Sequence, residues 1–139
     1  MKQVGFVPGF VLALFLTACT NSDRKPVFPV QGKVIYRGKP ATGARVIFHP
    51  QDENGPQSPR PSAEVQPDGS FRLSTYVSQD GAPPGRYAVT IFWPSAARIA
   101  DTENAGPDQL HGRYSNHKTT PIRVEIVAGA NVLDTFKLQ

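Results

Sequence analysis

The side chain with the most distinctive chemistry in this sequence is its single cysteine, Cys19. A thiol can act as a nucleophile, ligate a metal, form a disulfide or accept a covalent attachment. A disulfide or a cysteine-based metal site within the chain would need a second cysteine, and the 139 residues contain only one. The sequence around Cys19 must therefore indicate whether the thiol is reactive or is a point of attachment.

An apolar segment without charged residues leads up to Cys19. Lys2 supplies one positive charge, and residues 10–16 read FVLALFL. This run is shorter than the roughly 20 apolar residues that a membrane-spanning helix needs. A basic start, a short apolar run and small residues before a cut are typical of a secretory signal peptide. We therefore expect the chain to begin with a secretory signal peptide.

The end of that segment, Leu16-Thr17-Ala18-Cys19, resembles the lipobox of bacterial lipoproteins. The resemblance implies that residues 1–18 are a signal peptide cleaved between Ala18 and Cys19. It also implies that Cys19 is thioether-linked to diacylglycerol, with acyl chains such as palmitate, and becomes the first mature residue. Each buried methylene adds about 0.8 kcal/mol to membrane binding, so several chains on one residue give a stable anchor. The alternative is a cysteine that merely ends an ordinary secretory signal.

The expected anchor also gives an expected location. We expect a membrane-anchored lipoprotein that faces the periplasm or the cell exterior. Thr20 follows the cysteine where some sorting systems read Asp as a signal for the inner membrane. The resemblance therefore favours the outer membrane over the inner one.

Three histidines, His49, His111 and His117, are further candidates for metal or acid–base chemistry. His111 and His117 share a segment with Asp108, but a spacing of six residues matches no familiar ligand pattern. His49 lies on the outward side of an expected strand. We interpret all three as surface histidines and expect no metal site and no cofactor.

The sequence offers little for catalysis. Asp52 and Asp80 lie just before glycines, but neither belongs to the regular acidic spacing of a calcium loop, and turn chemistry accounts for both. No Gly-x-Ser-x-Gly motif is present, and no serine has an obvious histidine partner. We expect that the protein is not an enzyme, with a cryptic hydrolase as the least favoured alternative.

The charge of the chain is mildly basic. A formal net charge of +4 arises from 15 Lys and Arg against 11 Asp and Glu. The basic residues are scattered, and no run of basic and aromatic residues forms a stacking platform for bases. These features argue against a nucleic-acid partner.

The chain after residue 29 shows the alternation of half-buried strands. Its 12 glycines and 14 prolines are typical of short strands joined by turns, and no helical period of useful length follows residue 20. A single all-β sandwich of about seven strands is therefore predicted over residues 30–139, with residues 19–29 as its lipidated tether. The expected strands cover residues 30–36, 44–49, 63–65, 71–75, 86–93, 122–127 and 131–138.

The same alternation predicts the core. Residues 66–70 should form a hairpin turn, Gly32 should allow a close backbone approach, and the Tyr87 hydroxyl should tie down the turn before its strand. Asp134 has the parity of a core row, so we expect a bulge or a strand end there. The expected inward side chains are Val30, Val34, Tyr36, Ala44, Val46, Phe48, Phe71, Leu73, Thr75, Tyr87, Val89, Ile91, Trp93, Ile122, Val124, Ile126, Val132, Phe136 and Leu138.

Residues 94–120 form a long segment without a clear strand pattern, and such segments are often functional. Trp93, Leu110, Arg113 and Tyr114 lie in or beside it, and Trp, Tyr and Arg are enriched in binding hot spots. These four residues are the candidate binding loop. The alternative, which we favour, is that Leu110 and Tyr114 cover an open edge or end of the sandwich.

Four blocks, PVQGKVIYRGKPATGARVIFHP, PDGSFRLST, DGAPPGRYAVTI and GRYSNHKTTPIRVEIVAGANVLDTFKL, extend the resemblance over residues 29–138. Together they resemble the carboxypeptidase-regulatory-like lipoproteins of planctomycete-type bacteria. The resemblance implies a transthyretin-like (prealbumin-like) Greek-key sandwich on the cell envelope, without a well-established activity.

A related transthyretin-like branch hydrolyses 5-hydroxyisourate and ends in Tyr-Arg-Gly-Ser, whereas this chain ends in Phe136-Lys137-Leu138-Gln139. We therefore expect a non-enzymatic, lipid-anchored envelope module with a binding or structural role. The alternative is a carbohydrate- or protein-binding accessory module of an envelope enzyme, and the expected partner is an envelope protein or glycan.

Overall fold

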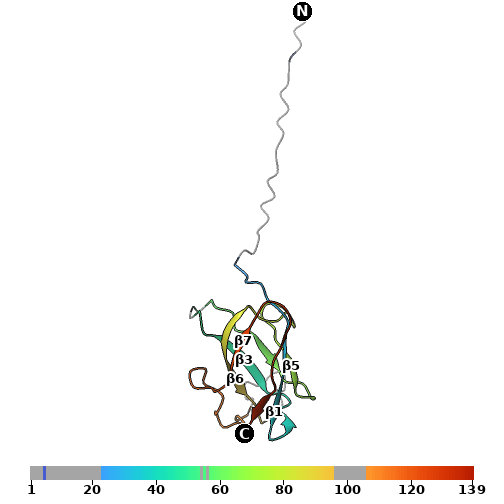
Figure 1. Cartoon of the computed structure of the whole chain (residues 1–139), viewed down its shortest axis with the longest axis vertical. Helices are drawn as coiled ribbons and strands as arrows, with labels where there is room; N and C mark the ends of the chain where they lie inside the picture. Colours follow the sequence, from blue (N-terminus) through green and yellow to red (C-terminus); the bar gives the residue numbers. More distant parts are fainter. Residues whose placement is uncertain (1–4, 6–22, 54, 56, 96–105) are drawn as a thin grey trace, which may run out of the picture.

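A computed structural model of the protein describes residues 5, 23–53, 55, 57–95 and 106–139. Within these residues the chain is all β, without a helix, and its strands form two facing sheets (Figure 1). The predicted β-sandwich is therefore confirmed. The strands are β1 (Val30–Tyr36), β2 (Lys39–Pro40), β3 (Arg45–Pro50), β4 (Ser62–Glu64), β5 (Ser70–Arg72), β6 (Gly85–Phe92), β7 (Arg123–Ile126), β8 (Asn131–Val132) and β9 (Phe136–Leu138).

The first sheet is built around β1. Strands β2 and β5 pair with β1 in antiparallel orientation, and β8 and β9 pair with it in parallel orientation. Gln31 faces both Arg72 of β5 and Val132 of β8, so β1 is flanked on both sides. Strand β1 is therefore the centre of this sheet.

The second sheet is antiparallel throughout, in the order β4-β3-β6-β7. Strand β6 pairs with β3 from Tyr87 to Phe92 but with β7 only from Gly85 to Ala88. The second half of β6 therefore lacks a strand on the β7 side, and its backbone groups there need another partner.

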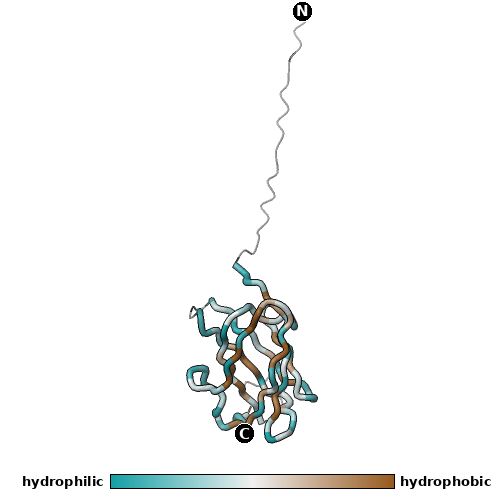
Figure 2. The backbone as a smooth tube through the Cα atoms, in the orientation of Figure 1, coloured by the Kyte–Doolittle hydropathy of each residue, from teal (hydrophilic) through white to brown (hydrophobic). Residues whose placement is uncertain are grey.

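The core lies between the two sheets, where the expected alternation places apolar side chains. Phe48 of β3 packs against Phe71 of β5 and Tyr87 of β6, with ring centroids 6.3 and 5.8 Å apart. Phe71 also stacks on Phe136, at 5.8 Å. Figure 2 shows that hydrophobic residues are concentrated along the strands and hydrophilic residues at the turns.

The Tyr87 side chain confirms the predicted tie to the turn before β6. Its buried hydroxyl donates to the carbonyl oxygen of Pro83 at 2.7 Å. Burial raises the pKa of the phenol to about 12, so the hydroxyl stays protonated and able to donate across the physiological range.

The predicted turn at residues 66–70 forms, but the strands on its two sides join different sheets. Gln66 N donates to Ser70 O at 2.8 Å, and Asp68 accepts from Ser70 N at 2.9 Å. Strand β4 pairs with β3 whereas β5 pairs with β1. Ser62 and Ser74 still form an antiparallel bridge across the two arms, with N–H to oxygen hydrogen bonds of 3.0 Å in both directions, so the predicted hairpin turn forms while its two strands pair into different sheets.

The prediction that Val132 points inward is wrong, because 74% of this residue is exposed. Its neighbour Asn131 is buried instead, since the Asn131 side chain accepts from Val127 N at 3.0 Å and donates to Val127 O at 2.9 Å. Residues 133–135 interrupt the strand that was expected over residues 131–138 and separate β8 from β9. After this interruption the Phe136 side chain faces the core. The exposed Asp134 lies in the interruption, so its expected position at a strand end is confirmed.

Two glycines allow close approaches between segments. A Cβ on Gly32 would lie 2.7 Å from the Phe71 ring, so a close approach occurs at Gly32, but it is made by a side chain and not by the predicted backbone. A Cβ on Gly81 would overlap the carbonyl group of Phe28, and Gly81 also has a φ of +101°. At this point residues 28 and 82 form a β-bridge, with N–H to oxygen hydrogen bonds of 3.0 Å in both directions.

We predict that Gly81→Ala lowers the free energy of unfolding by more than about 3 kcal/mol, because it combines backbone overlap with a left-handed φ. Gly43→Ala is the matched control, since Gly43 has a φ of +83° but no atom within 4 Å of its Cβ position. The control should lose only about 1 kcal/mol. Urea unfolding of both variants measures the difference, and equal losses would contradict the overlap.

Candidate functional site

The segment that follows β6 closes the open side of that strand. Val89 N donates to Ile122 O and Ile91 N donates to Tyr114 O, both at 2.9 Å. The Thr120 hydroxyl donates to Val89 O at 2.7 Å and is buried. We call residues 106–122 the covering segment, because they satisfy the backbone groups that β7 leaves free.

The structure divides the candidate binding loop into buried and exposed parts. Leu110 and Tyr114 are only 3% and 8% exposed and belong to the hydrophobic core. Their place in the core fits the covering role. Trp93 is half-buried and Arg113 is exposed, so these two residues are the surface part of the four.

Asp108 organises the start of the covering segment. Its carboxylate accepts hydrogen bonds from the backbone N–H groups of Trp93 at 2.9 Å and of Leu110 and Gly112 at 3.0 Å. The return bond from Gln109 N to Trp93 O is 2.8 Å long. The carboxylate that sequence reasoning weighed as a metal ligand therefore holds backbone groups.

One surface gathers aromatic and basic side chains at an end of the sandwich. The Trp93 indole N–H donates to Thr42 O at 2.8 Å, and its ring meets Tyr36 edge-on at 5.7 Å. The Arg37 guanidinium lies over the Tyr36 ring, 5.0 Å from its centroid, and Arg113 donates to Gln139 O at 2.5 Å. We call Tyr36, Arg37, Trp93 and Arg113 the aromatic end.

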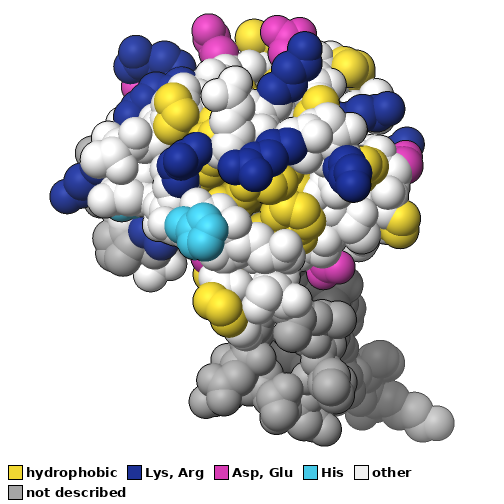
Figure 3. Space-filling view, turned by 90° about the horizontal axis from the view of Figure 1, so that it is seen from below, with side chains coloured by type: hydrophobic (Ala, Val, Ile, Leu, Met, Phe, Trp, Pro, Cys, Tyr) yellow, Lys and Arg dark blue, Asp and Glu magenta, His cyan; other side chains and the backbone are white. Residues whose placement is uncertain are grey.

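The aromatic end lies far from the point where the chain enters the domain. In Figure 1 residues 23–28 enter at the top, whereas the C-terminus and the end of β1 lie at the bottom. Figure 3 views the molecule from below and shows hydrophobic side chains near the centre of the face, with Lys and Arg around them. This arrangement combines apolar contact area with positive charge.

A second surface, which sequence reasoning missed, brings two of the histidines together. The rings of His49 and His117 stack with centroids 5.0 Å apart, and both line an open hollow of about 640 Å³. Arg60, Lys118 and Arg123 line the same hollow. We call these five residues the cationic hollow. His111 is exposed and is not among the residues that line it.

The sheet register explains why His49 and Arg123 meet. His49 of β3 faces Ala88 of β6, and Ala88 faces Arg123 of β7. The His49 and Arg123 side chains therefore lie on the same face of the second sheet, with the Ala88 methyl group between them. The alternation of the sequence indicated that the His49 side chain points outward. It could not indicate that Arg123 lies nearby, because that depends on the order of the strands in the sheet.

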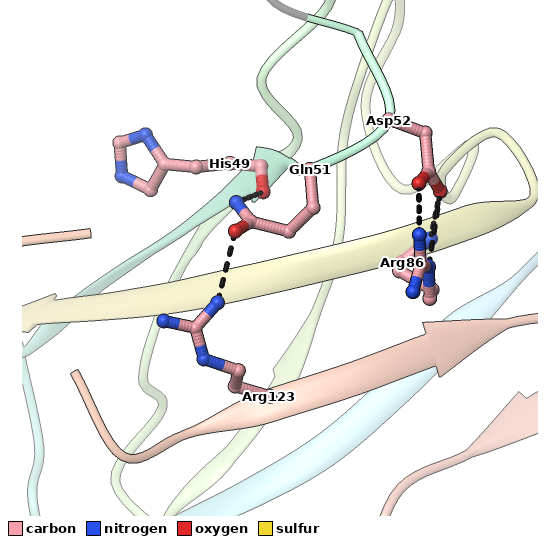
Figure 4. A network of polar contacts seen from close by, with 5 residues as sticks. All are labelled: His49, Gln51, Asp52, Arg86 and Arg123. Carbon is pink, nitrogen blue, oxygen red and sulfur yellow. Dashed lines mark hydrogen bonds and ion pairs between the residues drawn. The ribbon is translucent and has the colours of Figure 1, made fainter. Parts of the chain in front are cut away.

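Polar contacts hold the parts of this hollow in place (Figure 4). The Gln51 amide donates to His49 O at 3.0 Å and accepts from the Arg123 guanidinium at 2.9 Å. The His49 Nε2 atom lies 2.9 Å from the Thr90 hydroxyl. Burial lowers the pKa of His49, and the neighbouring His117 and Arg60 lower it further.

The acidic groups near the hollow are engaged elsewhere. Glu53 lines the hollow and forms an ion pair with Lys25. Asp52 forms an ion pair with Arg86 at 2.5 Å, and this bond lowers the pKa of the carboxyl (Figure 4). Both carboxylates thus have a cation of their own outside the cationic hollow.

The expected turn role of Asp80 is confirmed. Burial acts to raise the pKa of its carboxyl, but hydrogen bonds from the backbone N–H groups of Thr75, Val77 and Tyr76 lower it overall. Within the described part of the chain, no three His, Cys, Asp or Glu side chains gather in a way that could hold a metal ion.

The predicted lipidation site Cys19 and the predicted cleavage position after Ala18 lie outside the described residues. No helix among the residues that the structure describes is long and apolar enough to cross a membrane. From Arg24 onward the chain contacts the domain: the Arg24 guanidinium lies over the Tyr76 ring, and Lys25 N donates to the Tyr76 hydroxyl oxygen at 3.1 Å. The last residues of the expected tether are therefore held against the sandwich.

Comparisons with known proteins identify no family. No model of a known protein family matches the chain, and no curated protein matches it significantly. The resemblance to carboxypeptidase-regulatory-like lipoproteins therefore stays a prediction from the sequence blocks.

We predict that Asp108→Ala destabilises the protein by about 2 kcal/mol, because three backbone N–H groups lose their acceptor. Amide hydrogen exchange at Leu110 and Gly112 should accelerate, and the emission of Trp93 should change. Asp134→Ala is the control, since Asp134 is exposed in the interruption between β8 and β9. Similar exchange rates in the two variants would show that Asp108 does not hold the segment.

Proposed function

We propose that this protein is a non-enzymatic, lipid-anchored module of the cell envelope that binds a partner through its aromatic end. The anchor is proposed from Leu16-Thr17-Ala18-Cys19, where a thiol follows an apolar run and small residues. A lipidated chain of this kind faces the periplasm or the cell exterior, and Thr20 favours the outer membrane.

The observation that carries the binding role is the position of the aromatic end. Residues 23–28, which follow the proposed anchor, enter at the opposite end of the sandwich (Figure 1). An anchor at one end would leave Trp93 and Tyr36, with Arg37 and Arg113, directed away from the membrane. Trp, Tyr and Arg supply most of the binding energy in many interfaces, because they combine large contact area with directed hydrogen bonds.

A binding role is favoured over catalysis by what the acidic side chains do. Asp52 pairs with Arg86, Asp80 holds the turn that follows β5, and Asp108 holds the covering segment. A general acid or base must be within reach of a substrate proton, and these carboxylates are committed to structural partners. The proposed partner is an envelope protein or an envelope glycan.

The anchor is tested by replacing the thiol. Cys19→Ser should abolish incorporation of labelled palmitate and move the protein from the membrane fraction to the soluble fraction, because serine offers no thiol for the thioether. Thr20→Ser is the matched control and should keep both label and membrane retention. Unchanged labelling and retention in Cys19→Ser would overturn the lipid anchor.

The aromatic end is tested with Trp93, which is the only tryptophan of the chain and therefore its own reporter. Binding of envelope glycan fragments or of purified envelope proteins should shift its emission. The double variant Arg37→Asn and Arg113→Gln should weaken binding about tenfold or more, with Asn chosen because Arg37 has a φ of +49°.

The control for this test removes equal charge from another surface. Lys33→Gln with Arg72→Gln alters exposed positions of β1 and β5. This variant should bind as the unaltered protein does. Equal weakening by both double variants would indicate a nonspecific effect of charge and would contradict the aromatic end as the binding surface. A glycan response without a protein response would assign the partner as a glycan, and the reverse would assign a protein.

A further inference from the structure

We propose that the cationic hollow binds a tetrahedral oxyanion, a phosphate or sulfate group carried on a larger ligand. This site is separate from the aromatic end and does not depend on the lipid anchor. It is formed by His49, Arg60, His117, Lys118 and Arg123, which come from β3, two loops and β7.

Uncompensated positive charge is the first reason for an anionic ligand. Among the described residues, Arg60, Lys118 and Arg123 form no ion pair with a carboxylate. Glu53, the one acidic side chain among the described residues that line the hollow, is paired with Lys25. Three cations held around one hollow repel one another, and a bound anion would relieve this repulsion.

Preorganisation is the second reason. The Arg123 guanidinium is held by neutral acceptors, Gln51 Oε1 at 2.9 Å and Lys118 O at 3.4 Å. Asn116 fixes the turn that carries the next two residues of the site, since its side chain accepts from Lys118 N at 2.9 Å. Neutral partners fix the position of the guanidinium without neutralising its positive charge, so the charge can still attract an anionic ligand. Guanidinium groups also match the geometry of tetrahedral oxyanions.

The histidine pair is the third reason. Two stacked imidazoles at 5.0 Å cannot both gain a proton without mutual repulsion, and Arg60, Lys118 and Arg123 add to that cost. Glu53, which opposes these charges, is already paired with Lys25. A bound oxyanion would favour protonation of His49, and by linkage protonation of His49 would favour the oxyanion. Affinity should therefore rise as pH falls through the range in which histidines titrate.

The size and shape of the hollow indicate how the oxyanion is presented. An open hollow of about 640 Å³ is wider than a single ion requires and leaves room for the molecule that carries the group. The charged side chains are exposed, which implies weak binding to an isolated ion and stronger binding to a group on a larger ligand. The ligand class is therefore a phosphorylated or sulfated molecule.

The test uses the full chain and sodium sulfate at constant ionic strength, because sulfate keeps its double negative charge between about pH 5 and 8. Sulfate should shift the ring proton NMR signals of His49 and His117 and should raise the apparent pKa of His49. Affinity should be roughly tenfold higher at pH 5.5 than at pH 7.5. Chloride at the same ionic strength serves as the reference for nonspecific screening.

Variants separate a site from general attraction to a basic surface. Arg123→Gln should weaken sulfate binding roughly fivefold, and so should Arg60→Gln, whereas Arg72→Gln on β5 should leave it unchanged. Gln51→Glu keeps every cation but gives Arg123 a carboxylate, and it should weaken binding as Arg123→Gln does. No sulfate-specific shift of either histidine, or equal weakening by Arg72→Gln, would overturn the proposal.

The carrier of the oxyanion is decided by two further titrations at pH 5.5. Glucose 6-phosphate and glucose 6-sulfate present the same sugar with different tetrahedral groups. Binding of either ester that Arg123→Gln weakens supports a group carried on a larger ligand, and the tighter of the two, which both carry mainly one negative charge at this pH, gives the ester class. Binding of neither ester would contradict the proposed ligand class.

Discussion

The unfilled side of β6 is the constraint on which the other features of this structure depend. Strand β6 has eight residues, and β7 covers only its first half. Backbone N–H and C=O groups that lose water must find other partners. The covering segment meets this need through Ile122, Thr120 and Tyr114. By doing so, it buries Leu110 in the core and places His117 and Lys118 beside the outer face of the sheet.

Both candidate surfaces follow from this one arrangement. At one end of the covering segment, the Asp108 carboxylate accepts a hydrogen bond from the backbone N–H of Trp93. The Trp93 indole packs beside Tyr36. At the other end His117 stacks on His49, which lies in register with Arg123 across β6. A segment needed to complete the sheet therefore also brings functional groups from distant parts of the sequence together. Loosening the covering segment would therefore disturb both surfaces.

The two surfaces differ in their physical character and suit different ligands. The aromatic end offers ring area flanked by Arg37 and Arg113, and such surfaces bind partners through desolvated contact. The cationic hollow offers concentrated charge, and its affinity depends on ionic strength and protonation. A module with both could hold a partner at one end of the sandwich while an anionic group occupies the side of the second sheet.

The sequence alone determined the all-β class, the approximate strands and most of the core, because alternation of period two directly reports which side chains of a strand meet water. It also allowed Tyr87, Asp80 and Asp134 to be placed correctly, since each depends on neighbours close along the chain. It erred at Val132 because the Asn131 side chain reverses the parity of that strand through bonds that no alternation encodes. Only the tertiary structure decided the order of strands, and with it the meeting of His49 with His117 and Arg123, because contacts between distant residues depend on which strands pair. The sequence offered Cys19 as an anchor, and the fold decided which surfaces such an anchor would leave open to a partner.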